Sequence, residues 1–144
     1  MVDGGDKIKQ TVDEHWDSWY VAGLADFVRV PNLSLMVDPE FYTNGNTEKA
    51  IAVVEEYAQK LQIEGLVRHV IKPEGKSHLV VYVHESDGPN IMFYGHLDKQ
   101  PHGSGWDEDK HPTNPTIKDG WMYGRGASDD GYSAFSTLLS LKCA

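Results

Sequence analysis

The apolar residues of the first half of the chain recur every three to four positions, which is the period of a helix buried on one face. This spacing predicts a helix from Lys7 to Arg29, which Pro31 ends. Pro31 to Asn46 reads as an irregular connection, and a second helix is expected to begin at Asn46 or Thr47, either of which could cap it, and to close at Gly65. The apolar stripes of the two helices are Val12, Trp16, Tyr20, Leu24 and Phe27, then Ile51, Val54, Tyr57, Ala58 and Leu61.

The period changes after Gly65 to short runs rich in Val, Ile and aromatic residues, separated by turn residues. These runs predict strands at Leu66 to Ile71, Leu79 to Val83 and Ile91 to Tyr94. The last two are almost continuously apolar, as in strands that helices cover on both faces. The expected fold class is therefore α/β, with a layered mixed or parallel sheet flanked by helices.

The remaining part of the chain alternates between polar loop and regular structure. Gly95 to Pro115 is expected to be a long loop, and Thr116 to Tyr123 a strand or hairpin that turns through Asp119 and Gly120. A third helix is predicted from about Asp130 to Lys142.

Composition and charge restrict the function. The formal net charge of −9 argues against nucleic acid as a partner, because such binding needs clustered Lys and Arg. No run reaches the roughly 18 apolar residues of a membrane span, and no signal peptide is recognisable, so we expect a cytoplasmic protein without membrane contact. The single Cys143 rules out an internal disulfide framework.

His96 and Asp98 directly follow the third predicted strand, where open α/β sheets place their ligand crevice. Two residues apart in extended chain, their side chains point to the same side, so Asp98 could orient His96 as a metal ligand. An ordinary His and Asp in a solvated loop would give the same tripeptide. This segment alone leaves both interpretations open.

A second candidate segment runs from Tyr123 to Asp130, where two glycines permit a tight turn before Ser128 and two carboxylates. Carboxylate oxygens suit divalent cations. The same residues would also cap a helix and place acidic groups near the positive end of its dipole. Taken alone, capping and metal binding explain this segment equally well.

Together, the two segments resemble the carnosinase and cytosolic non-specific dipeptidase branch of the co-catalytic zinc exopeptidases. The matching text is FYGHLDxQP from Phe93, GW at Gly105, and DGxMYGRGASD from Asp119 to Asp129. The resemblance covers mainly residues 91–140. It implies that residues 1–144 form the N-terminal part of a metallopeptidase catalytic domain, incomplete on its own.

Transferred by position, the resemblance implies that His96 is a terminal ligand of one metal, that Asp129 bridges two metals, and that Asp98 is the catalytic acid in the outer shell. Asp130 is not assigned as a ligand; it could cap the helix or support the site. The implied cofactor is two zinc ions, with Mn or Co possible, and the implied reaction is hydrolysis of a dipeptide or small amide. In relatives, the general base and further ligands come from later sequence.

Two departures from the family pattern bear on these expectations. Relatives usually have a Lys-Gly pair after the acidic pair. This chain instead reads Asp130, Gly131, Tyr132, as if one residue were missing or replaced. Lys99 stands where an apolar residue is usual, and we expect its side chain to point to solvent.

Whether the chain is itself an enzyme is left open by the sequence. It is expected to be inactive alone and to bind metal poorly. The alternatives are a non-catalytic remnant of the fold that acts as a structural or interaction subunit, and a small metal-binding module. An exposed sheet edge would favour a protein partner or a dimer.

Overall fold

The computed structural model describes residues 4–85 and 87–144. The helix predicted from Lys7 to Arg29 is confirmed as one helical run, interrupted by a π-helical stretch in its middle. The second and third predicted helices are also present, and the third follows a kinked turn in which Asp129 and Asp130 have non-helical backbone angles. The elements are α1 (Gly4–His15), η1 (Trp16–Val21), α2 (Ala22–Arg29), α3 (Asn46–Lys60), η2 (Ala127–Gly131) and α4 (Tyr132–Cys143).

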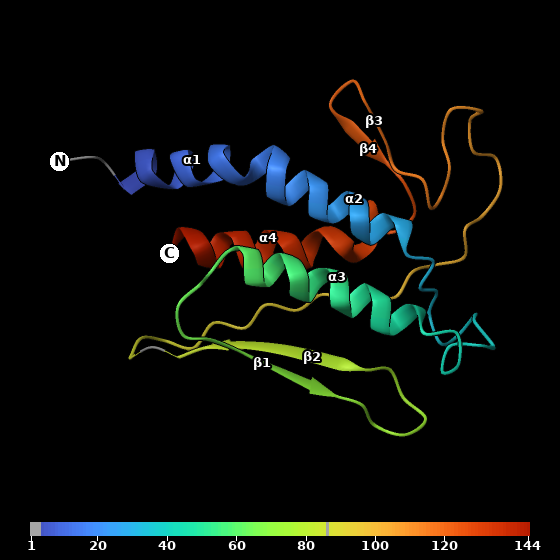
Figure 1. Cartoon of the computed structure of the whole chain (residues 1–144), viewed down its shortest axis with the longest axis horizontal. Coiled ribbons are helices and arrows are strands. Elements are labelled where there is room, and N and C mark those ends of the chain that lie inside the picture. The colour runs from blue at the N-terminus through green and yellow to red at the C-terminus, as the bar shows by residue number, and fades with distance from the viewer. Residues whose placement is uncertain (1–3, 86) are drawn as a thin grey trace.

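The core lies between the helices, which run side by side in Figure 1: α4 packs against α1, and α2 packs directly against α3. Phe135 of α4 is fully buried and meets the rings of Trp19 and Tyr57 edge-on, with centroids 5.9 and 6.0 Å away. The Trp19 indole also donates a 2.7 Å hydrogen bond to the Tyr57 carbonyl. Such offset aromatic contacts add to the stability gained from burial alone.

Two antiparallel hairpins complete the mixed α/β fold. In the first, β1 (Leu66–Ile71) pairs with β2 (Leu79–His84), so that Leu66 lies opposite His84. In the second, β3 (Thr116–Lys118) pairs with β4 (Trp121–Tyr123). Its turn has positive φ at Asp119 (53°) and Gly120 (79°), the conformation that favours these residue types. The strands predicted at Leu66 to Ile71 and Leu79 to Val83 and the hairpin predicted at Thr116 to Tyr123 are therefore confirmed.

The prediction of a buried strand at Ile91 to Tyr94 is wrong. This segment belongs to neither hairpin, and Ile91 and Met92 are 78% and 91% exposed. The sheets of the described residues are both antiparallel pairs, and the only parallel contact there is the isolated bridge between Leu33 and Lys99. The apolar run thus has no neighbouring strand in the described chain that could pair with it.

The start of α3 also differs from the expectation. The helix begins at Asn46 as predicted, but neither Asn46 nor Thr47 caps it, because Gly45 occupies the N-cap position. Asn44 Oδ1 instead accepts a 2.9 Å hydrogen bond from the Asn46 amide. The helix ends at Lys60, earlier than the predicted Gly65.

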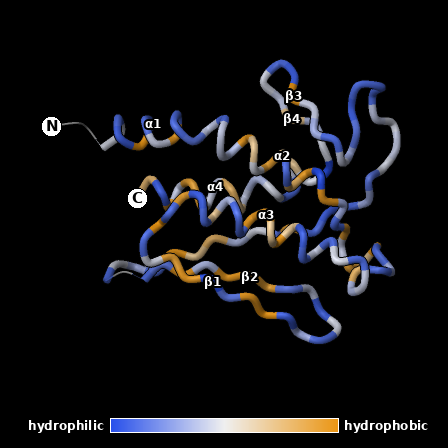
Figure 2. The backbone as a smooth tube through the Cα atoms, in the orientation of Figure 1, coloured by the Kyte–Doolittle hydropathy of each residue, from blue (hydrophilic) through white to orange (hydrophobic). Residues whose placement is uncertain are grey.

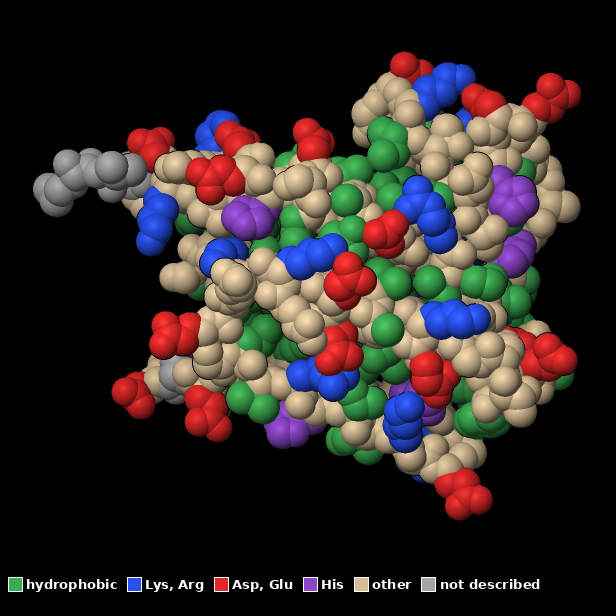
Figure 3. Space-filling model, in the orientation of Figure 1, with side chains coloured by type: hydrophobic (Ala, Val, Ile, Leu, Met, Phe, Trp, Pro, Cys, Tyr) green, Lys and Arg blue, Asp and Glu red, His purple; other side chains and the backbone are tan. Residues whose placement is uncertain are grey.

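The surface is mixed in character. Apolar and polar stretches alternate along the helices in Figure 2, as amphipathic helices require. On the face drawn in Figure 3, Lys and Arg side chains are interspersed with Asp and Glu. None of the helices in residues 4–85 and 87–144 has the length and apolar character needed to cross a membrane.

Candidate metal centre

The segment that carries His96 and Asp98 is anchored to the chain that follows α2. The Asn32 side-chain amide donates to the Leu97 carbonyl at 2.8 Å, and the Lys99 amide donates to the Asn32 carbonyl at 3.0 Å. Ser34 N–H in turn donates to the Lys99 carbonyl at 2.9 Å. These hydrogen bonds, rather than pairing in a sheet, fix the backbone on both sides of Asp98.

The segment that carries Asp129 turns tightly against α2. The Gly131 amide donates to the Gly126 carbonyl at 3.0 Å, and Gly126 has a φ of +85°. A Cβ at Gly131 would lie 2.3 Å from Phe27 Cε1, so no side chain fits there. Gly131 therefore permits close contact between the turn and α2.

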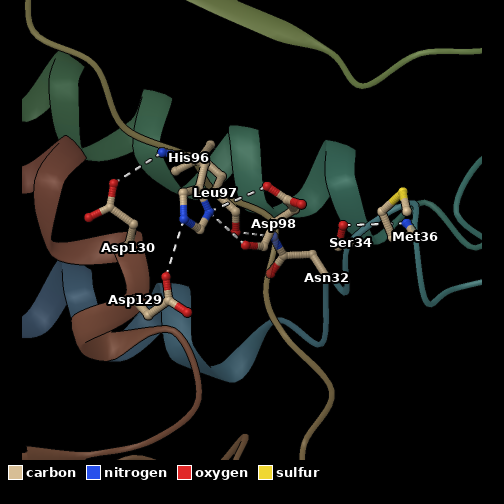
Figure 4. A network of polar contacts seen from close by, with 8 residues as sticks. All are labelled: Asn32, Ser34, Met36, His96, Leu97, Asp98, Asp129 and Asp130. Carbon is tan, nitrogen blue, oxygen red and sulfur yellow. Dashed lines mark hydrogen bonds and ion pairs between the residues drawn. The ribbon is translucent and has the colours of Figure 1, made fainter.

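The two segments meet at His96, as Figure 4 shows. His96 Nε2 lies 3.2 Å from Asp129 Oδ1, and the His96 backbone amide donates to Asp130 Oδ2 at 3.2 Å. The peptide bond between Asp129 and Asp130 is cis. The structure thus brings together the two residues that the sequence singled out as metal ligands.

The ring of His96 is oriented by Asp98. His96 Nδ1 lies 3.0 Å from the Asp98 carbonyl oxygen and 3.4 Å from its carboxylate Oδ1. Donation from Nδ1–H to the carbonyl leaves a lone pair on Nε2, facing the Asp129 carboxylate. Two such acceptors repel each other unless a proton or a metal ion lies between them. Asp98 therefore lies beside His96 as expected, and its closest contact is through the backbone.

The residues present fit a metal ion in part. A tetrahedral zinc ion holds its N and O ligands at about 2.0–2.2 Å, which places two ligand atoms about 3.3 Å apart. The 3.2 Å between His96 Nε2 and Asp129 Oδ1 agrees with that separation. Within residues 4–85 and 87–144, however, no group of three or more His, Cys, Asp or Glu side chains could hold a metal. In the described residues, His96 and Asp129 are thus two side chains spaced to bind one ion, fewer than a zinc site requires.

Asp130 and Lys99 have roles that the sequence left open or missed. The Asp130 side chain does not cap α4, and its contact with the His96 amide supports the site instead. The expectation that Lys99 points to solvent is wrong, because Lys99 is 1% exposed and its Nζ donates to backbone carbonyls. Asn32, 3% exposed, was also missed. Neither residue belongs to a periodic pattern that could have revealed it.

Comparison with known proteins agrees with the geometry. Residues 92–143 match the family described as Peptidase family M20/M25/M40. A succinyl-diaminopimelate desuccinylase of Sulfurimonas denitrificans is 45% identical over 64 residues, which cover 43% of this chain and 17% of that protein. A second desuccinylase, from Sulfurovum sp., is 34% identical over 88 residues, covering 60% of this chain and 22% of that protein.

The structural likeness extends over almost the whole chain. The crystal structure of human carnosine dipeptidase 1 matches with a TM-score of 0.71 and 25% identity, covering 96% of this chain and 30% of that one. The similarity to curated relatives therefore spans about a fifth of their length or less. Motifs, family match and structure thus agree in likening residues 92–143 of this chain to peptidase family M20/M25/M40.

Proposed function

We propose that this chain carries part of the catalytic centre of a dinuclear metal-dependent amide hydrolase. His96 and Asp129 are its metal ligands, and Asp98 is the acid beside them. The observation that carries the proposal is the 3.2 Å approach of His96 Nε2 to Asp129 Oδ1, from two segments that both lie inside the family match.

Each residue has a defined part in this site. Asp98 holds the imidazole through its carbonyl oxygen, so that Nε2 faces the metal position. The Asp129 side chain is 60% exposed, which leaves its carboxylate accessible to a second ion. A pair of divalent ions, zinc or alternatively manganese or cobalt, would polarise the scissile carbonyl and lower the pKa of the attacking water.

The proposed substrate class is a small molecule with one amide bond to be cleaved. The dipeptidase and the desuccinylases among the similar proteins are named for different substrates. A dipeptide and an N-succinyl amino acid are therefore the two substrates to compare.

We further propose that residues 1–144 on their own hydrolyse neither substrate. A catalytic zinc ion takes three protein ligands and a water, whereas His96 and Asp129 are the two that converge here. The rest of the site would come from outside the described residues. A non-catalytic structural or interaction subunit remains the second candidate, and the exposed run from Ile91 to Tyr94 favours it.

Zinc or cobalt titration of the chain, together with hydrolysis assays on both substrates, tests these proposals. Weak metal binding that His96→Ala abolishes, without hydrolysis, is the expected result. His69→Ala, which alters an exposed histidine on β1, is the matched control and should change nothing.

Other outcomes would contradict the proposal. Hydrolysis that His96→Ala abolishes would show that the chain is a complete enzyme. Tight stoichiometric zinc without hydrolysis would indicate a small metal-binding module. If the chain binds no metal at millimolar concentration, the result would support the second candidate, a non-catalytic structural or interaction subunit.

A further inference from the structure

Lys99 is a charged side chain in the interior of the protein. Its side chain is almost entirely buried, and Nζ donates to the carbonyl oxygens of Phe27 at 2.7 Å, Val28 at 3.3 Å and Val30 at 2.6 Å. These carbonyls lie at the C-terminal end of α2, where the last carbonyls of a helix lack donors within the helix and carry partial negative charge. The ammonium group therefore closes the end of α2.

The backbone of Lys99 is joined to the segment that carries His96. It exchanges hydrogen bonds with Asn32 and Ser34, and Asn32 also binds the Leu97 carbonyl. Any displacement of the Lys99 backbone would therefore move Asp98, its immediate neighbour, and with it the carbonyl that orients the His96 ring.

The aliphatic part of Lys99 contacts the segment that carries Asp129. A Cβ at Gly126 would lie 2.6 Å from Lys99 Cε and 2.9 Å from both Cδ and Cγ. The Gly126 backbone thus packs against the aliphatic chain of Lys99. The Gly126 carbonyl also accepts the hydrogen bond from the Gly131 amide that closes the turn. The Phe27 ring joins both features, because it lies 4.2 Å from Lys99 Nζ and directly against Gly131.

We propose that Lys99 is a positioning residue of the metal centre: fixed to the end of α2, it holds the His96 and Asp129 segments at the separation needed to bind one ion. This rests on the proposed function in one respect, namely that His96 and Asp129 bind the metal. An apolar residue of similar length would fill the same space but would leave the carbonyls at the end of α2 without these donors. The hydrogen-bonding Nζ group, rather than the bulk of the side chain, is what the proposal requires.

Lys99→Met removes the ammonium and keeps most of the aliphatic chain. The matched control is Lys118→Met, which alters an exposed lysine on β3. Metal affinity is expected to fall about 10- to 100-fold in Lys99→Met, as is typical when the residues that orient metal ligands are altered. Lys118→Met should bind metal like the unmodified chain.

Amide hydrogen exchange distinguishes positioning from a general loss of stability. In Lys99→Met, the His96 and Gly131 amides should exchange faster while amides in the middle of α3 keep their protection. A purely structural role would instead lower protection throughout, in proportion to the lost free energy of unfolding. Unchanged metal affinity in a folded Lys99→Met chain, or unchanged exchange at His96 and Gly131, would overturn the proposal.

The exchange measurement keeps this inference separate from the proposed function. If the unmodified chain binds no metal, the proposed function fails, and exchange alone decides the role of Lys99. If Lys99→Met does not fold, exchange in the unmodified chain decides it. The amides of His96, Lys99 and Gly131 should then open with one common free energy, and clearly different opening energies would refute the proposal.

Discussion

His96 Nε2 and Asp129 Oδ1 lie 3.2 Å apart, close enough to share one metal ion. Because each residue completes the same pair, removing either should abolish most of the metal affinity that both provide. We expect His96→Ala, Asp129→Asn and the double variant to lose similar amounts of binding free energy in calorimetric titrations with zinc. Asp87→Asn, at an exposed position, is the control. Losses that simply add up in the double variant would indicate two independent sites.

Asp130 should act through its oxygen as an acceptor rather than through its charge. Its Oδ2 receives the backbone amide of His96 at 3.2 Å, and an asparagine can present an oxygen in the same place. Asp130→Asn is therefore expected to keep metal affinity close to that of the unmodified chain. Asp130→Ala, which leaves the amide unpaired, should weaken it several-fold. Equal losses in the two variants would show that the negative charge matters instead.

Gly131 should not tolerate a side chain. An added Cβ would lie 2.3 Å from Phe27 Cε1 and 2.5 Å from the Gly126 carbonyl, which forces the turn away from α2. Gly131→Ala is expected to lower the free energy of unfolding by roughly 1–3 kcal/mol in urea denaturation. Gly4→Ala is the comparison, since nothing lies within 4 Å of a Cβ there. A stable Gly131→Ala chain would contradict the packing described for this turn.

Stability should rise with pH above neutrality because of Lys99. Burial lowers the pKa of Lys99 from 10.5 to about 7. Between about pH 7 and pH 10.5 the unfolded chain then binds more protons than the folded one. The free energy of unfolding should therefore increase across this window, by at most ~1.4 kcal/mol per pH unit from this group.

Urea denaturation at a series of pH values measures this dependence. Lys99→Met should lose the part of the slope that comes from Lys99, whereas Lys118→Met should keep it. An identical slope in Lys99→Met and the unmodified chain would show that Lys99 does not titrate in this range.

The helices could be predicted from the sequence because their signal is local. Residues close together in the sequence are enough to recognise the apolar stripes of α2 and α3 and the proline that follows Arg29. The hairpin through Asp119 and Gly120 follows in the same way from turn chemistry. The strand predicted at Ile91 to Tyr94 failed because pairing depends on a neighbouring strand, which local sequence cannot supply.

Sequence reasoning singled out the two residues that the structure brings together, but it missed the residues that hold them in place. His96 and Asp129 stood in a recognisable motif, and the structure brings them together. Lys99 looked like a surface residue because isolated charges usually are. The carbonyls at the end of α2, which come from a distant part of the chain, accept hydrogen bonds from its Nζ and favour its burial.

The exposed run from Ile91 to Tyr94 has a consequence for the protein in concentrated solution. Between 61% and 91% of each of these four side chains faces solvent, next to backbone that no strand covers. The net charge of −9 keeps copies apart while ionic strength is low. Added salt screens that repulsion, so that contacts between the exposed apolar runs of different copies are no longer prevented. Self-association of the protein would then depend on these four neighbouring residues, and its solubility would be higher at low salt than at high salt.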